Sequence, residues 1–199
     1  MDISVDLLST AYYLSVTGLV VFSLVLYSLK RLFGLDFWVA WERPTISLLV
    51  VIFGSAWWVV NLALAIYLSI QKPVGLFSAT YTWRGVGLLF VLVGLAIGLW
   101  AMKTFQTVRK LYGKIDSLVT QGPYRYTRNP QYLSLALITT GAALFFNSLH
   151  LLLFAATITA SVYFAALMEE QELEKVFGRQ YVAYKKKTPR LMPFTKLRR

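Results

Sequence analysis

A cluster of acidic side chains follows directly on a long uncharged stretch near the C-terminus. Its members are Glu169, Glu170, Glu172 and Glu174. On a continuous helix, Glu169 and Glu172 share one face, while Glu170 and Glu174 share another. One acid is then expected to face the protein core while its neighbour faces basic loop residues. An acid at membrane depth is a candidate for a functional role.

These acids need a positive charge nearby, because they lie close to the negative end of the helix dipole. The sequence offers two kinds of partner. The first is an ordinary ion pair with one of the basic residues Arg125, Arg128 or Lys175. The second is a cationic ligand.

A second polar segment, 116–132, is rich in tyrosines and turn residues. Gly122-Pro123 predicts a turn. Asn129-Pro130 predicts a helix start, with Asn129 as the capping side chain and Pro130 at the first helical position. The free amides of such a start are a natural seat for a carboxylate or a phosphate. An arginine-anchored start of a membrane span is the alternative, but it does not explain the tyrosines.

The composition excludes several kinds of site. The chain has no cysteine, which excludes disulfides and thiolate zinc sites. His150 is the single histidine, so a haem or non-haem iron site, or a hydrolase triad, would depend on that residue alone.

The elements that position these segments are membrane helices. The chain has 199 residues, of which 57% are apolar and only 15% are charged, and its mean hydropathy is +0.59. We expect an all-α, polytopic membrane protein that forms one domain over 1–199. A polar interruption at 147–150 divides the last uncharged run into a helical hairpin. The five predicted spans are roughly 7–29, 45–70, 84–104, 130–147 and 150–168.

The basic residues predict the orientation of these spans. Eighteen of the 20 lysines and arginines fall in the first and third loops and in the tail, whereas Lys72 and Arg84 lie on the other side. Because such residues favour cytoplasmic loops, we expect the N-terminus outside and the C-terminus in the cytoplasm. The charges flank spans and no nucleic-acid module is visible, so we expect membrane lipids and not nucleic acid as partners.

Two further patterns concern packing at the membrane. The predicted third span carries Gly94 and Gly98 four residues apart, which favours close helix approach in lipid. In the tail, apolar residues recur at intervals of three and four over 173–184, with Gly178 inside the pattern. We expect an amphipathic, cytoplasmic helix there, acting as an anchor or as a lid over a pocket.

Together these motifs resemble the isoprenylcysteine carboxyl methyltransferase and phospholipid methyltransferase superfamily. The resemblance covers roughly 84–194, while 1–80 holds two N-terminal spans. It is carried by Leu118-Val119-Thr120-x-Gly122-Pro123-Tyr124, Arg128-Asn129-Pro130-x-Tyr132, Glu169-Glu170, Phe177-Gly178-x-x-Tyr181-x-x-Tyr184 and Pro189-Arg190-x-x-Pro193.

The resemblance implies an integral-membrane enzyme that uses S-adenosylmethionine, bound in a cytoplasm-facing pocket, to methylate a lipophilic or lipidated acceptor. By position, the implied cofactor contacts are Asp116, Ser117, Leu118, Val119, Tyr124, Asn129, Pro130, Gln131, Tyr132 and Glu169. The aromatic tail, at Tyr181 and Tyr184, would close over the adenosine.

Methyl transfer is an in-line displacement that needs no metal, thiol or histidine, and alignment supplies most of its rate. A carboxylate acceptor needs no base, whereas a protonated amine needs one, for which Glu170 and Tyr132 are the candidates. Isoprenylcysteine enzymes resemble this chain less at two positions: Asn129 stands where they usually have histidine, and Ala165 where they have a substrate-reading arginine. Arg128 or Arg190 is the candidate replacement.

Two other functions stay open at this point. A reductase of the sterol-reductase type has a similar C-terminal hairpin and would bind NADPH. A non-enzymatic membrane scaffold would bind no nucleotide and would tolerate Glu169→Gln.

Overall fold

The computed structural model describes residues 3–33, 44–78, 80–112 and 117–191. Within these ranges the chain forms helices and no strand, so the prediction of an all-α protein is confirmed. The helices are α1 (Ile3–Phe33), α2 (Pro44–Gln71), α3 (Thr80–Tyr112), the 3₁₀ turn η1 (Gly122–Arg125), α4 (Pro130–Phe145), α5 (Leu149–Phe177) and α6 (Arg179–Lys187).

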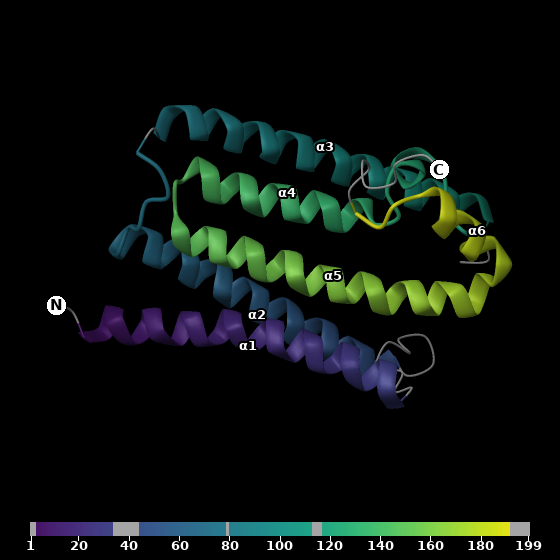
Figure 1. Ribbon diagram of the computed structural model, residues 1–199, viewed down its shortest axis with the longest axis horizontal. Helices are drawn as coiled ribbons and strands as arrows, with labels where there is room; N and C mark the ends of the chain where they lie inside the picture. Colours follow the sequence, from purple (N-terminus) through teal and green to yellow (C-terminus); the bar gives the residue numbers. More distant parts are fainter. Residues whose placement is uncertain (1–2, 34–43, 79, 113–116, 192–199) are drawn as a thin grey trace.

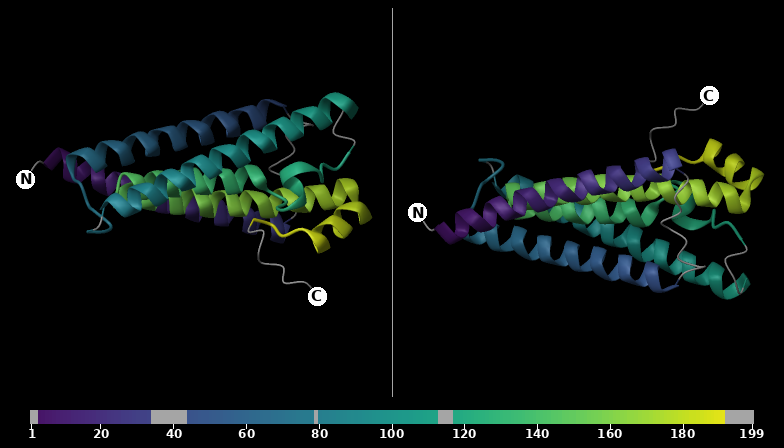
Figure 2. Two further views of the ribbon diagram at one scale, coloured as in Figure 1. Left: turned by 90° about the horizontal axis from the view of Figure 1, so that it is seen from above. Right: turned by 90° about the horizontal axis from the view of Figure 1, so that it is seen from below.

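The five long helices lie roughly along one axis (Figures 1 and 2). Helix α4 lies between α3 and α5, and α1 and α2 pack against α5 from its other side. The C-terminal part of α5, the short helix α6 and the segment around η1 meet at one end of the bundle, called here the site end. The N-termini of α1 and α5 lie at the opposite end.

Three helices in the described part of the chain are long and apolar enough to cross a membrane. They are Ser4–Leu32, Tyr81–Thr107 and Leu149–Phe177. The apolar part described in α2, Ala56–Gln71, is shorter. So is α4, whose 16 residues extend about 24 Å at 1.5 Å per residue. Each of the five predicted spans overlaps a helix, and three of these helices are long and apolar enough to cross within the part of the chain that the structure describes.

Glycines allow α3 and α4 to approach closely, as the small-residue pattern predicted. A Cβ atom on Gly87 would stand 2.5 Å from the backbone nitrogen of Phe145 and 2.6 Å from the carbonyl oxygen of Gly141. One on Gly98 would stand 2.5 Å from Ser134 Oγ. Ser134 also donates a hydrogen bond of 2.7 Å to the carbonyl of Gly94. Packing against α4 therefore explains Gly87, Gly94 and Gly98 of α3.

The predicted hairpin between α4 and α5 is confirmed, and its turn is built on Asn147. This residue has a φ of +49°, in the left-handed region that asparagine tolerates better than most residues. Its Oδ1 accepts hydrogen bonds from the amides of Leu76 and Phe77, at 2.9 and 3.0 Å. The side chain therefore ties the hairpin to the α2–α3 loop. Ser148 then caps α5 by accepting a bond from the amide of Leu151.

The prediction of one amphipathic helix through 173–184 was wrong. Helix α5 continues to Phe177, and Gly178 then adopts a φ of +48°, which few residues other than glycine adopt readily. The chain turns there and α6 begins at Arg179. The spacing of the apolar residues did not reveal the break, because it fits a helix both before and after Gly178.

Candidate active site

Each acid of the cluster at the end of α5 has a different set of partners. Glu172 pairs with Lys30 of α1 at 2.6 Å and with Lys175 at 3.2 Å. Glu174 pairs with Lys185 of α6 at 2.9 Å. Helix α5 is continuous through this turn, and neighbouring acids have different partners, as predicted. Glu169 and Glu172, which were expected to share a face, contact different helices: Glu169 meets Tyr132 of α4 and Glu172 meets Lys30 of α1.

Glu170 is held by two arginines and is almost fully buried, with 2% of its surface exposed. Its Oε1 accepts from Arg190 Nε at 2.8 Å, and its Oε2 accepts from Arg190 Nη2 at 3.0 Å. Arg128 Nη1 lies 3.1 Å from the same Oε2. Arg190 also donates from Nη1 to the Tyr163 hydroxyl at 3.0 Å. The hydrogen bond with Glu170 raises the pKa of Arg190. The group carries one net positive charge, and the buried Nε of Arg128 has no hydrogen-bond partner among the described residues.

Glu169 differs from the other three acids, because no described cation pairs with it. The partner it does have is Tyr132 of α4, whose hydroxyl donates to Oε1 at 2.5 Å. Tyr124 lies close enough for the Glu169 carboxylate to act on it. Burial, together with that carboxylate, raises the pKa of Tyr124 to about 12, so its hydroxyl stays protonated at neutral pH.

The start of α4 is where the sequence predicted it, but the predicted cap is absent. Asn129 occupies the N-cap and Pro130 the first helical position, and the Asn129 side chain makes no capping hydrogen bond. Its Nδ2 donates instead to the carbonyl of Arg190, at 3.1 Å. The amides of Gln131 and Tyr132 belong to the first turn, which has no intrahelical acceptor.

The C-terminal segment is joined to the segment before α4 by several hydrogen bonds. The amide of Arg128 donates to the carbonyl of Pro189 at 2.9 Å. The Thr127 hydroxyl donates to the carbonyl of Arg190 at 2.9 Å. From α6, the Tyr184 hydroxyl donates to the carbonyl of Tyr124 at 2.5 Å.

The aromatic residues of α6 are buried against this segment. Tyr181 is 1% exposed. Burial, with the nearby Glu170 carboxylate, raises the pKa of Tyr181, and burial likewise raises the pKa of Tyr184. Helix α6 therefore covers the segment between η1 and α4 in this structure.

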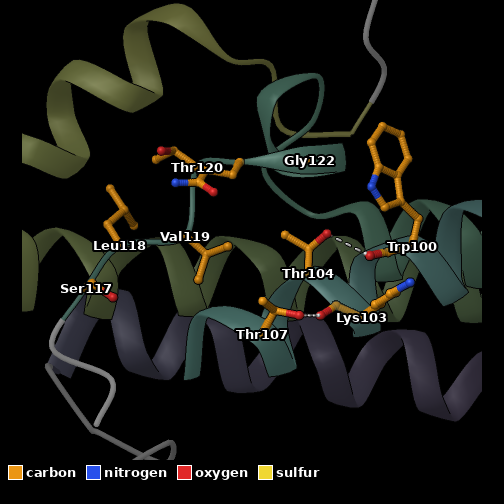
Figure 3. A pocket seen from close by; sticks show the side chains of 10 residues that line it. Trp100, Lys103, Thr104, Thr107, Ser117, Leu118, Val119, Thr120 and Gly122 are labelled. Carbon is orange, nitrogen blue, oxygen red and sulfur yellow. Dashed lines mark hydrogen bonds between the residues drawn. The ribbon is translucent and has the colours of Figure 1, made fainter. Parts of the chain in front are cut away.

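A pocket of about 480 Å³ lies between α3 and the segment before η1 (Figure 3). It is lined from α3 by Trp100, Lys103, Thr104 and Thr107, and from the facing segment by Ser117, Leu118, Val119, Thr120, Gln121 and Gly122. Three of the predicted cofactor contacts thus line a pocket. Asp116 and Pro193 lie outside the described residues.

An apolar groove of about 550 Å³ is formed by α4, α5 and Leu191. Its lining residues are Thr140, Leu152, Ala156, Thr159, Ala160, Tyr163, Phe164 and Leu191. Tyr163 belongs both to this groove and to the group around Glu170, because its hydroxyl meets Arg190. The arginine–glutamate group therefore adjoins one part of an apolar groove.

The structure brings together most, but not all, of the predicted site. The residues that meet around the end of α5 are Tyr124, Arg128, Asn129, Tyr132, Glu169, Glu170, Tyr181 and Tyr184. Pro130 and Gln131 are at the start of α4 beside them. Ser117, Leu118 and Val119 line the pocket against α3, and Tyr181 and Tyr184 do not line it. The sequence interpretation missed Lys30, Trp100 and Tyr163, which belong to apolar helices and carried no motif.

Comparison with known proteins gave two matches, neither of which covers the whole chain. Residues 83–180 match the phospholipid methyltransferase family. A Protein-S-isoprenylcysteine O-methyltransferase from Xenopus laevis is 32% identical over 123 residues, which cover 58% of this chain and 42% of that protein. The chain thus spans less than half the length of this relative. No solved structure gave a significant match.

The matched stretch contains Tyr124, Arg128, Tyr132, Glu169 and Glu170, the residues that meet at the site end. It also contains the hairpin of α4 and α5 that positions them. Residues 83–180 therefore match the phospholipid methyltransferase family, whose members are membrane enzymes that use S-adenosylmethionine as methyl donor, and they are distantly similar to an isoprenylcysteine methyltransferase.

Proposed function

We propose that this chain transfers a methyl group from S-adenosylmethionine to a lipophilic acceptor at the membrane face where α5 ends. The observation that carries this proposal is that Glu169 has no cationic partner among the described residues. Three acids of the cluster have described cationic partners, whereas Glu169 has the neutral hydroxyl of Tyr132. A partly buried carboxylate without a counter-charge favours a cationic ligand.

The residues of the site fit the charges of this cofactor. When bound, S-adenosylmethionine supplies an electrophilic methyl group on a sulfonium, and it also carries an ammonium and a carboxylate. Glu169 would hold one of the positive groups. The amides of Gln131 and Tyr132, at the positive end of the α4 dipole, would hold the carboxylate.

The acceptor is proposed to be a phospholipid amine or an isoprenylcysteine-like carboxylate. The apolar groove between α4 and α5 supports the proposal of a lipophilic acceptor, because a hydrocarbon chain would fit in it. The head group of that acceptor would then lie next to Arg190, which contacts Tyr163 of the groove. Arg190 is also better exposed than Arg128, at 26% against 7% of the side chain. Isoprenylcysteine enzymes have a substrate-reading arginine where this chain has Ala165. We assign that role here to Arg190, and Arg128 is the second candidate because it is less exposed.

An amine acceptor needs a base, and the contacts favour Tyr132 over Glu170. Both oxygens of Glu170 are occupied by guanidinium groups. The Tyr132 hydroxyl already directs its proton to Glu169. It would accept the proton released by the amine nitrogen while its own proton moves to Glu169 Oε1.

We further propose that all five long helices cross the membrane, with the N-terminus outside and the site end in the cytoplasm. The clustering of basic residues in the first loop, the third loop and the tail supports this orientation. The close packing of α4 between α3 and α5 supports its crossing despite its length of 16 residues.

The first experiment is a calorimetric titration of the detergent-purified full chain with S-adenosylmethionine, with S-adenosylhomocysteine and, in parallel, with NADPH. The methyltransferase proposal expects binding of the first two and not of the third. Binding of NADPH alone would favour the reductase. Binding of none of the three by folded protein would favour a scaffold.

The variant Glu169→Gln tests the observation directly. We expect it to weaken S-adenosylmethionine binding by at least about tenfold, about 1.4 kcal/mol, because a partly buried charge pair is lost. S-adenosylhomocysteine has no sulfonium, so an equal loss for both ligands would assign Glu169 to the ammonium, and a larger loss for S-adenosylmethionine would assign it to the sulfonium. Glu174→Gln, on the same helix, is the matched control. Unchanged affinity of Glu169→Gln for both ligands would contradict the proposal.

A further inference from the structure

Helix α1 lies outside the stretch that matches the family, yet it packs along α5 for most of its length (Figure 2, right). Tyr12 donates to the carbonyl of His150 at 2.6 Å, Ser23 to Ser161 Oγ at 3.4 Å, and Lys30 to the carbonyl of Met168 at 3.3 Å. In each pair the partners are separated by 138 positions. The two helices therefore run parallel in one constant register.

This register brings Lys30 to the turn of α5 that carries the acids of the site. Its Nζ lies 2.6 Å from Glu172 Oε1 and 3.3 Å from the carbonyl oxygen of Met168. These two acceptors come immediately before and shortly after Glu169 and Glu170 in the chain. Lys30 thus joins α1 to both ends of the acid turn from the side away from α4.

Burying the ammonium group of Lys30 costs free energy of desolvation, which its contacts must offset. Lys30 is 4% exposed, and a buried ammonium is stable only when it is paired and hydrogen-bonded. The Glu172 carboxylate and the Met168 carbonyl contribute to meeting that need. The contact also neutralises Glu172, so that this acid does not compete with Glu169 for a cationic ligand.

We propose that Lys30 is a positioning residue of the cofactor site, which holds the turn Met168–Glu172 so that Glu169 meets the cation of S-adenosylmethionine. The inference rests on the proposed function. It extends the site to α1, which the family match leaves out, and makes the first helix necessary for cofactor affinity.

The test compares four full-length proteins in calorimetric titrations with S-adenosylmethionine and with S-adenosylhomocysteine: wild type, Lys30→Met, Lys30→Arg and Lys72→Met. Lys30→Met should weaken binding by about tenfold, as is typical when a group that orients a ligating side chain is lost. Lys30→Arg should restore most of the affinity. Lys72→Met breaks the pair of Lys72 with Asp6 at the opposite end, so it should bind like wild type.

A double variant separates positioning from general loss of stability. If Lys30 acts through Glu169, then Lys30→Met adds little to the loss already caused by Glu169→Gln. Independent, additive losses would overturn the inference. Wild-type affinity of folded Lys30→Met for both ligands would overturn it as well, while the proposed function would stand.

Two further outcomes are also decisive. Failure of the wild type to bind either ligand would refute the proposed function, and this inference with it. If Lys30→Met does not fold, Glu172→Gln replaces it, because it weakens the same link but keeps the contact of Lys30 with Met168. Weaker binding of Glu172→Gln supports the inference, and unchanged binding overturns it.

Discussion

At the scale of single residues, Glu170 is the side chain that links three segments of the chain. It lies on α5, and its arginine partners come from the segment before α4 and from the segment after α6. Buried charge pairs contribute little net stability against an apolar alternative, but breaking one leaves an uncompensated charge. The group therefore fixes how these segments meet.

The variant Glu170→Gln should lower the free energy of unfolding by about 3 kcal/mol or more, because two guanidinium groups lose their buried counter-charge. Unfolding in mixed micelles, followed by circular dichroism, measures the change. Glu174→Gln removes the exposed pair with Lys185 and should cost less than about 1 kcal/mol. Similar costs for both variants would show that the group around Glu170 is not structural.

The sequence predicted which residue types gather at the site better than it predicted their pairing. Arg128 and Lys175 were expected as partners of the acids, and both are. Lys30 was assigned only to membrane orientation, because a basic residue after an apolar run is expected there whatever it contacts. Asn129 was expected to cap α4, but the carbonyl of Arg190 competes for its side chain. Such long-range contacts depend on tertiary packing, which local patterns do not contain.

At the scale of the elements, hydrophobic runs predicted all five long helices, since an uncharged stretch of such length is typical of a membrane-spanning helix and of few other structures. The break at Gly178 was missed, because a glycine in a helical pattern is tolerated and its positive φ depends on how α6 docks. Of the glycines of α3, Gly94 and Gly98 were assigned correctly to packing. Spacing alone did not show which of them touch α4.

The two glycines near the start of α3 give a prediction at this scale. Gly87→Ala places a methyl group against the backbone of α4 and should destabilise the protein by about 1–3 kcal/mol. Gly85 has no atom within 4 Å of its would-be Cβ, so Gly85→Ala should be neutral or stabilising by up to about 1 kcal/mol. Thermal unfolding in detergent compares them. Equal effects would contradict the close packing of α3 on α4.

At the scale of the whole molecule, the membrane arrangement is testable because the chain has no cysteine. Ser78→Cys, between α2 and α3, and Lys186→Cys, on α6, each introduce a single thiol at an exposed position. In intact cells, a membrane-impermeant maleimide should label the first and not the second. These positions are separated by α3, α4 and α5, so labelling of both from one side would show that α4 does not cross. The reverse pattern would invert the orientation.

The order of synthesis has a consequence for the buried group at Glu170. Arg128 is made before Glu170, whereas Arg190 follows it by 20 positions. A chain that stops short of Arg190 therefore holds the Glu170 carboxylate with the single guanidinium of Arg128, as a neutral pair. This buried group acquires a net positive charge only when the chain extends to Arg190.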